Sequence, residues 1–130
     1  MNVVDSSGWL EYFGNGPNAG FFSKAIERTA DLVVPTVSVY EVFKRVLQQR
    51  GEDSALQAVA AMQQGVLADL TGPAALSAAR LSVDLGLPMA DSIMLATARM
   101  WDATLWTQDS DFEGMPGVKF IAKQANRERG

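Results

Sequence analysis

The sequence predicts an α/β protein: a central, mostly parallel sheet of about five strands, covered by helices on both faces in a three-layer α/β/α sandwich. Three observations lead to this prediction. Short runs rich in valine, leucine and isoleucine alternate with longer segments of helical periodicity. The short runs are apolar without alternation, as in strands that are buried on both faces. Helix-length segments separate them, which is the pattern of βαβ units with parallel strands.

The expected elements fill a chain of 130 residues, a length typical of one domain, 1–130. They are, in order, a strand at 3–4, a helix at 21–30, a strand at 31–34, helices at 36–50 and 52–64, a strand at 66–70, helices at 74–85 and 89–101, strands at 103–106 and 118–121, and a polar tail that frays from about 123.

Residues that start and stop helices set these boundaries. Asn18 and Thr36 are predicted N-caps, because a short polar side chain can accept a hydrogen bond from the first turn. Gly51 and Gly86 are predicted to end helices, because glycine readily adopts the conformation that follows the last turn. The other boundaries are prolines: Pro35 after a strand, and Pro73 and Pro88 before helices.

The composition excludes several kinds of site. The chain has no cysteine and no histidine, so disulfides, thiolate zinc, a Cys nucleophile, Ser-His-Asp triads and His-ligated metals are all excluded. The formal charge of −4 gives no general attraction to nucleic acid, although a bound cation reverses the sign of the field locally. No targeting or membrane-spanning pattern is present, so we expect a cytoplasmic protein.

Four acids follow or end predicted strands, at the edge where parallel α/β sheets bind ligands. Asp5 follows the first strand, Asp69 lies near the end of the third, and Asp109 and Asp111 follow the fourth. Each also has a purely structural interpretation. Asp5 could cap the next turn, Asp109 and Asp111 could be turn residues, and Asp69 is expected at a solvated edge.

Two further acids lie on predicted helices. Glu41 falls nearly opposite the apolar stripe of its helix, so periodicity places it toward solvent and assigns it no role. Asp91 lies in the first turn of a helix that is apolar almost all round and therefore buried. Stabilisation by the helix N-terminus is one explanation of Asp91, and membership of a functional site is the other.

Acids that converge on one crevice repel one another unless a cation neutralises them. Oxygen donors without His or Cys favour Mg²⁺ or Mn²⁺. Magnesium usually takes one or two carboxylates and leaves positions for phosphate oxygens. The chemistry to expect is therefore phosphoryl transfer or phosphodiester hydrolysis.

Four motifs occur in a recognisable order: VVDSS, SVYEVFKRV, MADSIMLATA and LWTQDSDF. In this order and spacing they resemble a PIN domain from Val3 to Phe120, and more narrowly a VapC-type toxin of a bacterial type II toxin–antitoxin pair. The resemblance implies the same three-layer α/β/α fold. It also implies an Mg²⁺- or Mn²⁺-dependent endoribonuclease that cleaves single-stranded or structured RNA and leaves 5′-phosphate and 3′-hydroxyl ends.

The resemblance assigns roles to individual residues. The family's acidic quartet, which is catalytic and binds the metal, falls on Asp5, Glu41, Asp91 and Asp109, and Asp111 matches an additional acid of the family. By this match, Glu41 turns toward the active groove. Thr107 matches a supporting hydroxyl residue, and Ser6 matches a small hydroxyl residue that could hold a water of the metal. Tyr40 departs from the family's pattern.

The resemblance further implies partners: an RNA substrate, a cognate antitoxin protein, and a second copy of the chain in a homodimer whose grooves join the two sites. The candidate contacts to RNA phosphates are Lys44, Arg45, Arg50 and Arg80. For each of them, a solvated helix face is the alternative.

One other interpretation is open at this stage, and the residues argue against two more. The chain could be a PIN-like module that binds a protein and has weak or no catalysis, although all four acids are present. A receiver-like phospho-acceptor needs an acidic pair after the first strand, where Asp5 stands alone, and a lysine after the last, whereas Lys119 lies inside it. A haloacid-type hydrolase needs a second aspartate two residues after Asp5, where the chain has Ser7.

Overall fold

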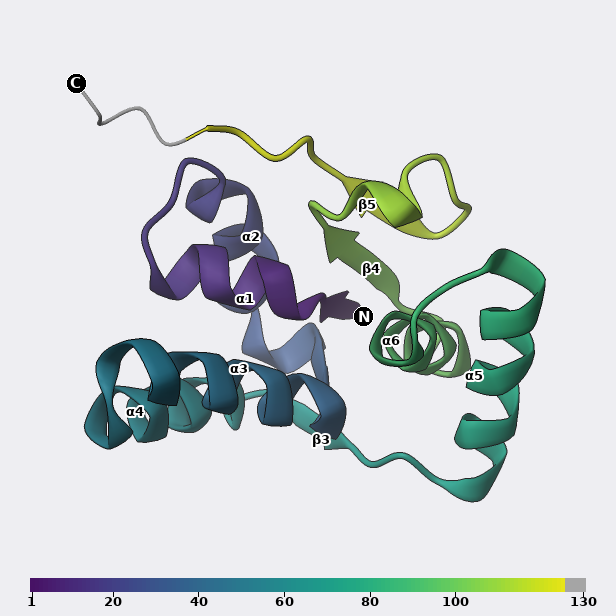
Figure 1. Ribbon diagram of the computed structural model, residues 1–130, viewed down its shortest axis with the longest axis horizontal. Coiled ribbons are helices and arrows are strands. Elements are labelled where there is room, and N and C mark those ends of the chain that lie inside the picture. Colours follow the sequence, from purple (N-terminus) through teal and green to yellow (C-terminus); the bar gives the residue numbers. More distant parts are fainter. Residues whose placement is uncertain (126–130) are drawn as a thin grey trace.

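A single parallel sheet organises the computed structural model, which describes residues 1–125 (Figure 1). Its five strands are arranged in the order β3-β2-β1-β4-β5, and every neighbouring pair is parallel. The strands are β1 (Asn2–Val4), β2 (Leu32–Pro35), β3 (Val66–Ala68), β4 (Thr104–Thr107) and β5 (Val118–Phe120). The predicted parallel sheet of about five strands is confirmed.

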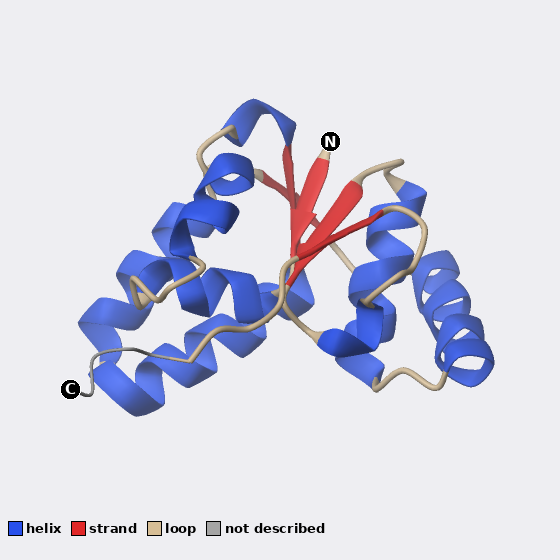
Figure 2. Ribbon diagram, turned by 90° about the horizontal axis from the view of Figure 1, so that it is seen from above, coloured by secondary structure: helices blue, strands red, loops and turns tan. Residues whose placement is uncertain are grey.

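Helices cover both faces of the sheet, which makes three layers (Figure 2). One face carries α1 (Ser6–Phe13), α2 (Ala19–Ile26), α3 (Thr36–Arg50) and α4 (Glu52–Met62). The other face carries α5 (Gly72–Leu85) and α6 (Met89–Met100). Two short 3₁₀ turns, η1 (Thr29–Asp31) and η2 (Ser110–Phe112), complete the described elements. The α/β/α sandwich is therefore confirmed as well.

The two cores follow from the alternation of side chains along each strand. Val4 and Trp106 point into the core beneath α1 to α4. Their neighbours Val3 and Leu105 point into the core beneath α5 and α6. All four side chains are buried, which explains why the strand segments contain unbroken apolar runs.

Helix α1 was not predicted from the sequence. The segment is short and contains Gly8, which weakens the helical signal. Packing requires this glycine: a Cβ atom there would lie 2.5 Å from a ring carbon of Phe22 and 2.8 Å from a methyl carbon of Val4. Helix α1 thus lies so close to the sheet and to α2 that no side chain fits at this position.

One predicted N-cap was wrong and the other is confirmed only in position. Thr36 is the first residue of α3, and Pro35 occupies its N-cap. Asn18 stands at the N-cap of α2, but its side chain makes no capping hydrogen bond. The predicted helix at 21–30 was wrong at its C-terminal end, because α2 (Ala19–Ile26) stops at Ile26 and η1 occupies the expected last turn. The other predicted bounds agree with the structure to within two residues. Gly51 and Gly86 follow helices with φ of 90° and 69°, as expected.

The segment after β5 does not fray where expected. The side-chain amide of Gln124 donates to the Asn18 side-chain oxygen at 2.9 Å, and the Asn18 amide donates to the Ala122 carbonyl at 3.1 Å. The remaining part of the predicted polar tail, residues 126–130, lies outside the described residues.

The strand order places β1 at the centre, with β2 on one side and β4 on the other. The connections from β1 to β2 and from β4 to β5 therefore run in opposite directions, which opens a crevice at the carboxyl ends of β1 and β4. No single helix within residues 1–125 is long and apolar enough to cross a membrane. The α5–α6 pair passes that test only together, bent by 117°, and α6 is buried against the sheet.

Candidate metal centre

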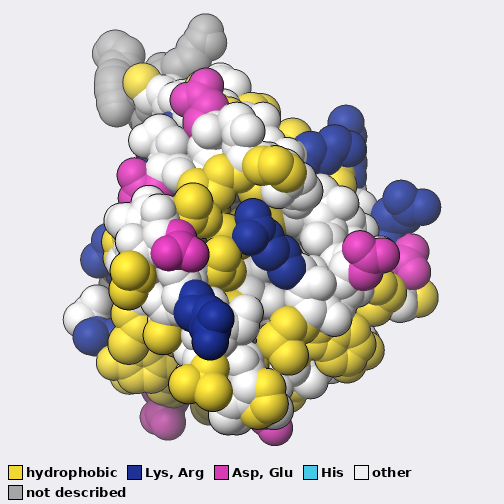
Figure 3. Space-filling model, turned by 90° about the vertical axis from the view of Figure 1, so that its right-hand side faces the viewer, with side chains coloured by type: hydrophobic (Ala, Val, Ile, Leu, Met, Phe, Trp, Pro, Cys, Tyr) yellow, Lys and Arg dark blue, Asp and Glu magenta, His cyan; other side chains and the backbone are white. Residues whose placement is uncertain are grey.

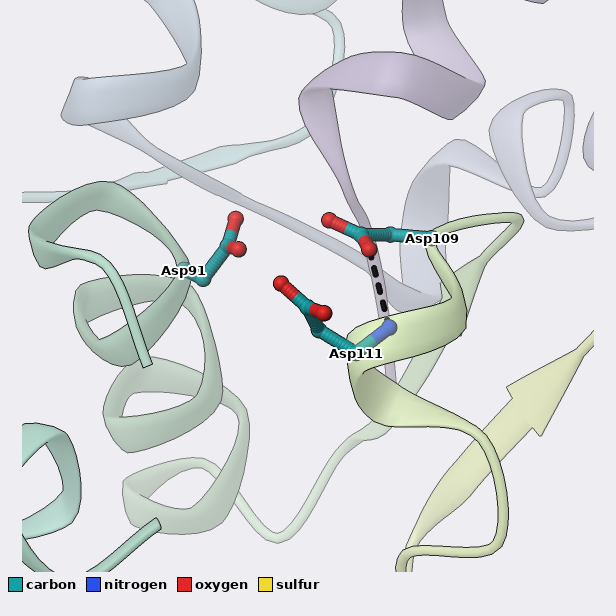
Figure 4. Close-up of side chains that lie close together, drawn as sticks. All are labelled: Asp91, Asp109 and Asp111. Carbon is teal, nitrogen blue, oxygen red and sulfur yellow. Dashed lines mark hydrogen bonds between the residues drawn. The ribbon is translucent and has the colours of Figure 1, made fainter. Parts of the chain in front are cut away.

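Three aspartates meet at the carboxyl edge of the sheet (Figure 4). Asp91 comes from the first turn of α6, Asp109 follows β4, and Asp111 lies in η2. Each contributes one carboxylate oxygen to a group in which these oxygens all lie within 4.8 Å of one another. The backbone N–H of Asp111 donates to the Asp109 carboxylate at 2.9 Å, which holds these two acids together.

The electrostatics of Asp91 show that further acids lie close by. Partial burial, together with the negative charges of the neighbouring acids, raises the pKa of Asp91 from 3.8 to about 7. These neighbours are Asp5, Asp109, Asp111 and Glu41. The functional interpretation of Asp91 is thus supported by its surroundings: it faces carboxylates and is only half-buried, although α6 is buried from Ser92 to Ala98.

Asp5 is not a member of this group of three but is more buried than any of them, with 3% of its surface exposed. Its side chain does not cap α1, although it stands at the N-cap position. One carboxylate oxygen instead accepts hydrogen bonds from the Thr107 hydroxyl at 2.8 Å and the Ser7 hydroxyl at 2.9 Å. Burial still raises the pKa of Asp5 above its ordinary value, because two hydroxyl donors do not replace full hydration.

Glu41 is half-buried and belongs to the side of α3 that faces α1. The Ser6 hydroxyl donates to its carboxylate at 2.7 Å, and its charge acts on Asp91. Periodicity alone placed Glu41 toward solvent; the side chain is half-buried and lines the same cavity as Tyr40, Lys44 and Arg45.

Thr107 links two of the acids. Its hydroxyl donates to Asp5 and accepts a hydrogen bond from the backbone N–H of Asp109 at 2.9 Å. The residue is fully buried, and its orientation is therefore fixed by β4. A single hydroxyl thus ties the end of β1 to the loop that carries Asp109.

A network of buried amides supports the same loop, and sequence reasoning missed it. Gln108 is 5% exposed; its amide nitrogen donates weakly to the Ser7 carbonyl and to the Glu11 carboxylate, each at 3.4 Å. Its side-chain oxygen accepts from Asn18 at 2.9 Å. In the sequence, Gln108 is marked only by its position between Thr107 and Asp109, and a glutamine at such a position does not by itself indicate that it supports a loop.

The remaining candidate residues divide between two places. Lys44 and Arg45 border the cavity that contains Glu41, and Arg45 and Arg50 border a neighbouring cavity between α1 and α3. Arg80 lies exposed on α5 and borders neither cavity. Asp69 is exposed after β3, as expected for a solvated edge, and is not part of the acidic group.

The donors of the acidic group fit a hard divalent cation. All of them are carboxylate oxygens, and they meet within the reach of one ion. Burial, and to a lesser extent repulsion from neighbouring carboxylates, raises the pKa values of Asp5 and Asp91, and a bound cation would offset both effects. Acidic ligands without nitrogen or sulfur are the set that Mg²⁺ and Mn²⁺ prefer.

The chain is therefore a small α/β domain with a parallel sheet of order β3-β2-β1-β4-β5. Acidic side chains that suit a divalent cation lie at the carboxyl edge of this sheet. The chain belongs to the PIN domain family, whose model matches residues 3–118. This match confirms the resemblance on which the site residues were aligned. A search of curated protein sequences finds no match.

Solved structures with the same fold include several toxins. A toxin–antitoxin complex from Klebsiella pneumoniae is similar with a TM-score of 0.77 and 21% identity, covering 92% of this chain and 96% of that one. The sarcin–ricin loop cleaving toxin VapC20 of Mycobacterium tuberculosis has a TM-score of 0.74 and 14% identity, over 89% and 95% of the two chains. DNA-bound VapBC from Salmonella typhimurium has a TM-score of 0.72 and 12% identity, over 94% and 97%. At these identities the likeness concerns the fold.

Proposed function

We propose that this PIN domain is a metal-dependent endoribonuclease and the toxin of a toxin–antitoxin pair. The observation that carries the proposal is the acidic group at the carboxyl edge of the sheet, in which Asp91, Asp109 and Asp111 lie within reach of one cation. The family membership supports a nuclease. The names of the structural relatives, toxin–antitoxin complexes and a loop-cleaving toxin, support the toxin role.

Asp91, Asp109 and the additional acid Asp111 would hold Mg²⁺ or Mn²⁺. Asp5 and Glu41 do not belong to this group of three, but their charges act on Asp91, and we propose that they complete the site. Such a cation supplies an activated water and neutralises charge on a phosphodiester. The chain itself fixes the donors: Thr107 and Ser7 orient the Asp5 carboxylate, and Ser6 orients Glu41. Ser6 was expected to hold a water, but its hydroxyl donates to Glu41, so we assign it to positioning that acid.

Two adjoining cavities offer a path for the RNA backbone. The cavity with Glu41 measures about 460 Å³ and shares Ser7, Leu10 and Arg45 with a second cavity of about 380 Å³ between α1 and α3. Lys44 and Arg45 border the first, and Arg50 borders the second. Positive side chains along a continuous groove beside an acidic centre are suited to phosphates on either side of the scissile bond. Arg80 does not border this path, so we no longer propose it as a phosphate contact.

We also propose a homodimer and an antitoxin partner. Exposed apolar side chains gather on this part of the molecule: Val83, 83% exposed, and Met89, 73% exposed, border a cavity between α5 and α6, and Leu76 on α5 is 70% exposed. Figure 3, which shows the side of the molecule where α5 lies, has hydrophobic side chains spread over that face. Met89 is two residues from Asp91, so a second copy seated there would bring the two acidic sites near each other. The mass of the purified protein in solution tests the proposed homodimer, and a monomeric mass refutes it.

Cleavage of a 5′-labelled single-stranded RNA tests the nuclease proposal. We expect products with Mg²⁺ or Mn²⁺, none with EDTA, and 5′-phosphate and 3′-hydroxyl ends. Asp5→Asn should abolish cleavage, and Asp69→Asn, an exposed acid outside the group, should leave it intact. Cleavage that persists in EDTA or in Asp5→Asn refutes the proposal, and absence of cleavage in every condition favours a protein-binding module.

The toxin role needs a test in cells. Expression of the chain should arrest growth, and co-expression of the product of an adjacent small reading frame should relieve the arrest. Asp5→Asn should not arrest growth, because the effect is proposed to depend on cleavage. Arrest by this variant would show that toxicity has another cause.

A further inference from the structure

Tyr40 is an exposed aromatic side chain that borders the same cavity as Glu41. The residue precedes Glu41 on α3, and 62% of its surface is exposed. The buried stripe of α3 is formed by Val42 and Val46, so Tyr40 contributes nothing to the core. The Tyr40 ring precedes a proposed catalytic acid and does not pack in the core, so it is free to contact a ligand that has a flat apolar face.

The surroundings of the ring are polar and positively charged. Tyr40 borders the cavity of about 460 Å³ that also contains Glu41, Lys44 and Arg45. The Lys44 ammonium lies 5.7 Å from the centre of the Tyr40 ring, near the outer limit of a cation–π contact, so the ring is not tightly covered. The floor of the cavity is formed in part by Ser6, whose hydroxyl is bonded to Glu41.

This combination fits a single-stranded nucleotide better than a protein side chain. A stacking ring, two cations and an acidic centre match the three parts of a nucleotide chain: base, flanking phosphate and scissile phosphate. An apolar protein partner would instead favour a continuous apolar patch. The next exposed apolar residue along the same side of α3 is Leu47, 41% exposed, which does not border the cavity.

We propose that Tyr40 is a stacking platform for a base of single-stranded RNA, next to the phosphate held at the acidic centre. Lys44 and Arg45 contact the phosphates that flank this base. The inference rests on the proposed nuclease function and adds to it a residue that selects unpaired substrate. A base inside a duplex has no free face for the ring, so the platform discriminates against paired RNA.

Binding of a short fluorescent single-stranded RNA, followed by anisotropy in an Asp5→Asn background, tests the proposal without cleavage. Tyr40→Ala should weaken binding about 5- to 100-fold, the range found when a stacked base loses its aromatic partner. Tyr40→Phe should restore it, because stacking needs the ring and not the hydroxyl. Leu47→Ala, an exposed apolar change on the same helix, is the matched control and should bind like the parent protein.

A second series locates the base. A set of RNAs, each with one abasic site, is bound to the parent protein and to Tyr40→Ala. One abasic position should weaken binding to the parent by the same factor as Tyr40→Ala weakens binding of the intact RNA, and should not weaken binding to Tyr40→Ala further. Equal losses in Leu47→Ala, failure of Tyr40→Phe to restore binding, or a changed oligomeric mass of Tyr40→Ala would overturn the inference and indicate a protein interface. If the parent chain cleaves RNA and Tyr40→Ala binds within twofold of it, the inference alone is wrong. If the parent neither binds nor cleaves RNA, the proposed function fails with it.

Discussion

Replacement of Asp91 by asparagine should stabilise the metal-free protein while removing its activity. Asp91 is half-buried among negative charges, and its pKa rises from 3.8 to about 7. An acid whose pKa is raised by folding binds its proton more tightly in the folded state. The folded state therefore loses stability as the pH rises above 3.8, and the loss is complete above about 7.

The size of the effect follows from the same values. Each pKa unit corresponds to about 1.4 kcal/mol, so the rise in the pKa of Asp91 from 3.8 to about 7 sets an upper limit of about 4 kcal/mol on the stability that the charged carboxylate costs. Asp91 is half-exposed, and solvent screens its neighbours, so we expect about 1–2 kcal/mol in practice. For a domain of this length, that gain raises the melting temperature by about 3–8 °C.

Thermal unfolding followed by circular dichroism, in EDTA at pH 8, measures this gain for Asp91→Asn against the parent. At pH 5 the gain should be smaller, because Asp91 is then largely protonated in the folded parent. Asp84→Asn, an exposed acid on α5, should not change the melting temperature by more than about 1 °C. The reasoning is refuted if Asp91→Asn is no more stable than the parent at pH 8, or gains as much at pH 5.

Two further predictions concern the supports of the site and of α1. Thr107→Val keeps the shape of a fully buried side chain but removes one hydrogen bond to Asp5. Urea unfolding should therefore show a free energy of unfolding lower by about 1–3 kcal/mol. A decrease below about 0.5 kcal/mol would contradict the role given to this hydroxyl. Gly8→Ala should cost about 1–3 kcal/mol through overlap with Phe22, whereas Gly20→Ala, with no atom within 4 Å of the added methyl, should stabilise α2 by about 0.5–1 kcal/mol. Equal effects of the two glycine variants would show that helix propensity, and not packing, sets the outcome.

Much of the fold was predictable because the signals are local. Unbroken apolar runs mark strands buried on both faces, and Gly51 and Gly86 mark helix ends through their own backbone preference. Helix α1 could not be predicted in this way. Gly8 lowers the local propensity, and the reason for a glycine there is the closeness of Phe22, which belongs to another helix. The role of Asn18 is equally non-local, because its side-chain hydrogen-bond partners come from the loop after β4 and from the segment after β5.

The candidate site was predictable in part. Strand ends identified Asp5 and Asp109, and the apolar helix around Asp91 marked that acid as unusual. Glu41 was accessible only through the resemblance to PIN domains, since a helical wheel does not show that α1 and its Ser6 hydroxyl lie beside α3. The metal-binding and catalytic roles of these acids stay predictions that the RNA cleavage experiment tests.

The buried amides of Gln108 and Asn18 give the segment after β5 an influence on the acidic centre that its position in the chain does not suggest. Residues 122–124 lie across these amides and supply the Ala122 carbonyl and the Gln124 amide as partners of Asn18. A protein that detached this segment would leave Asn18 short of two partners and loosen its bond to Gln108, one residue from Asp109. Hydrogen bonds through two buried side chains, Asn18 and Gln108, thus join the segment after β5 to the residue that precedes Asp109.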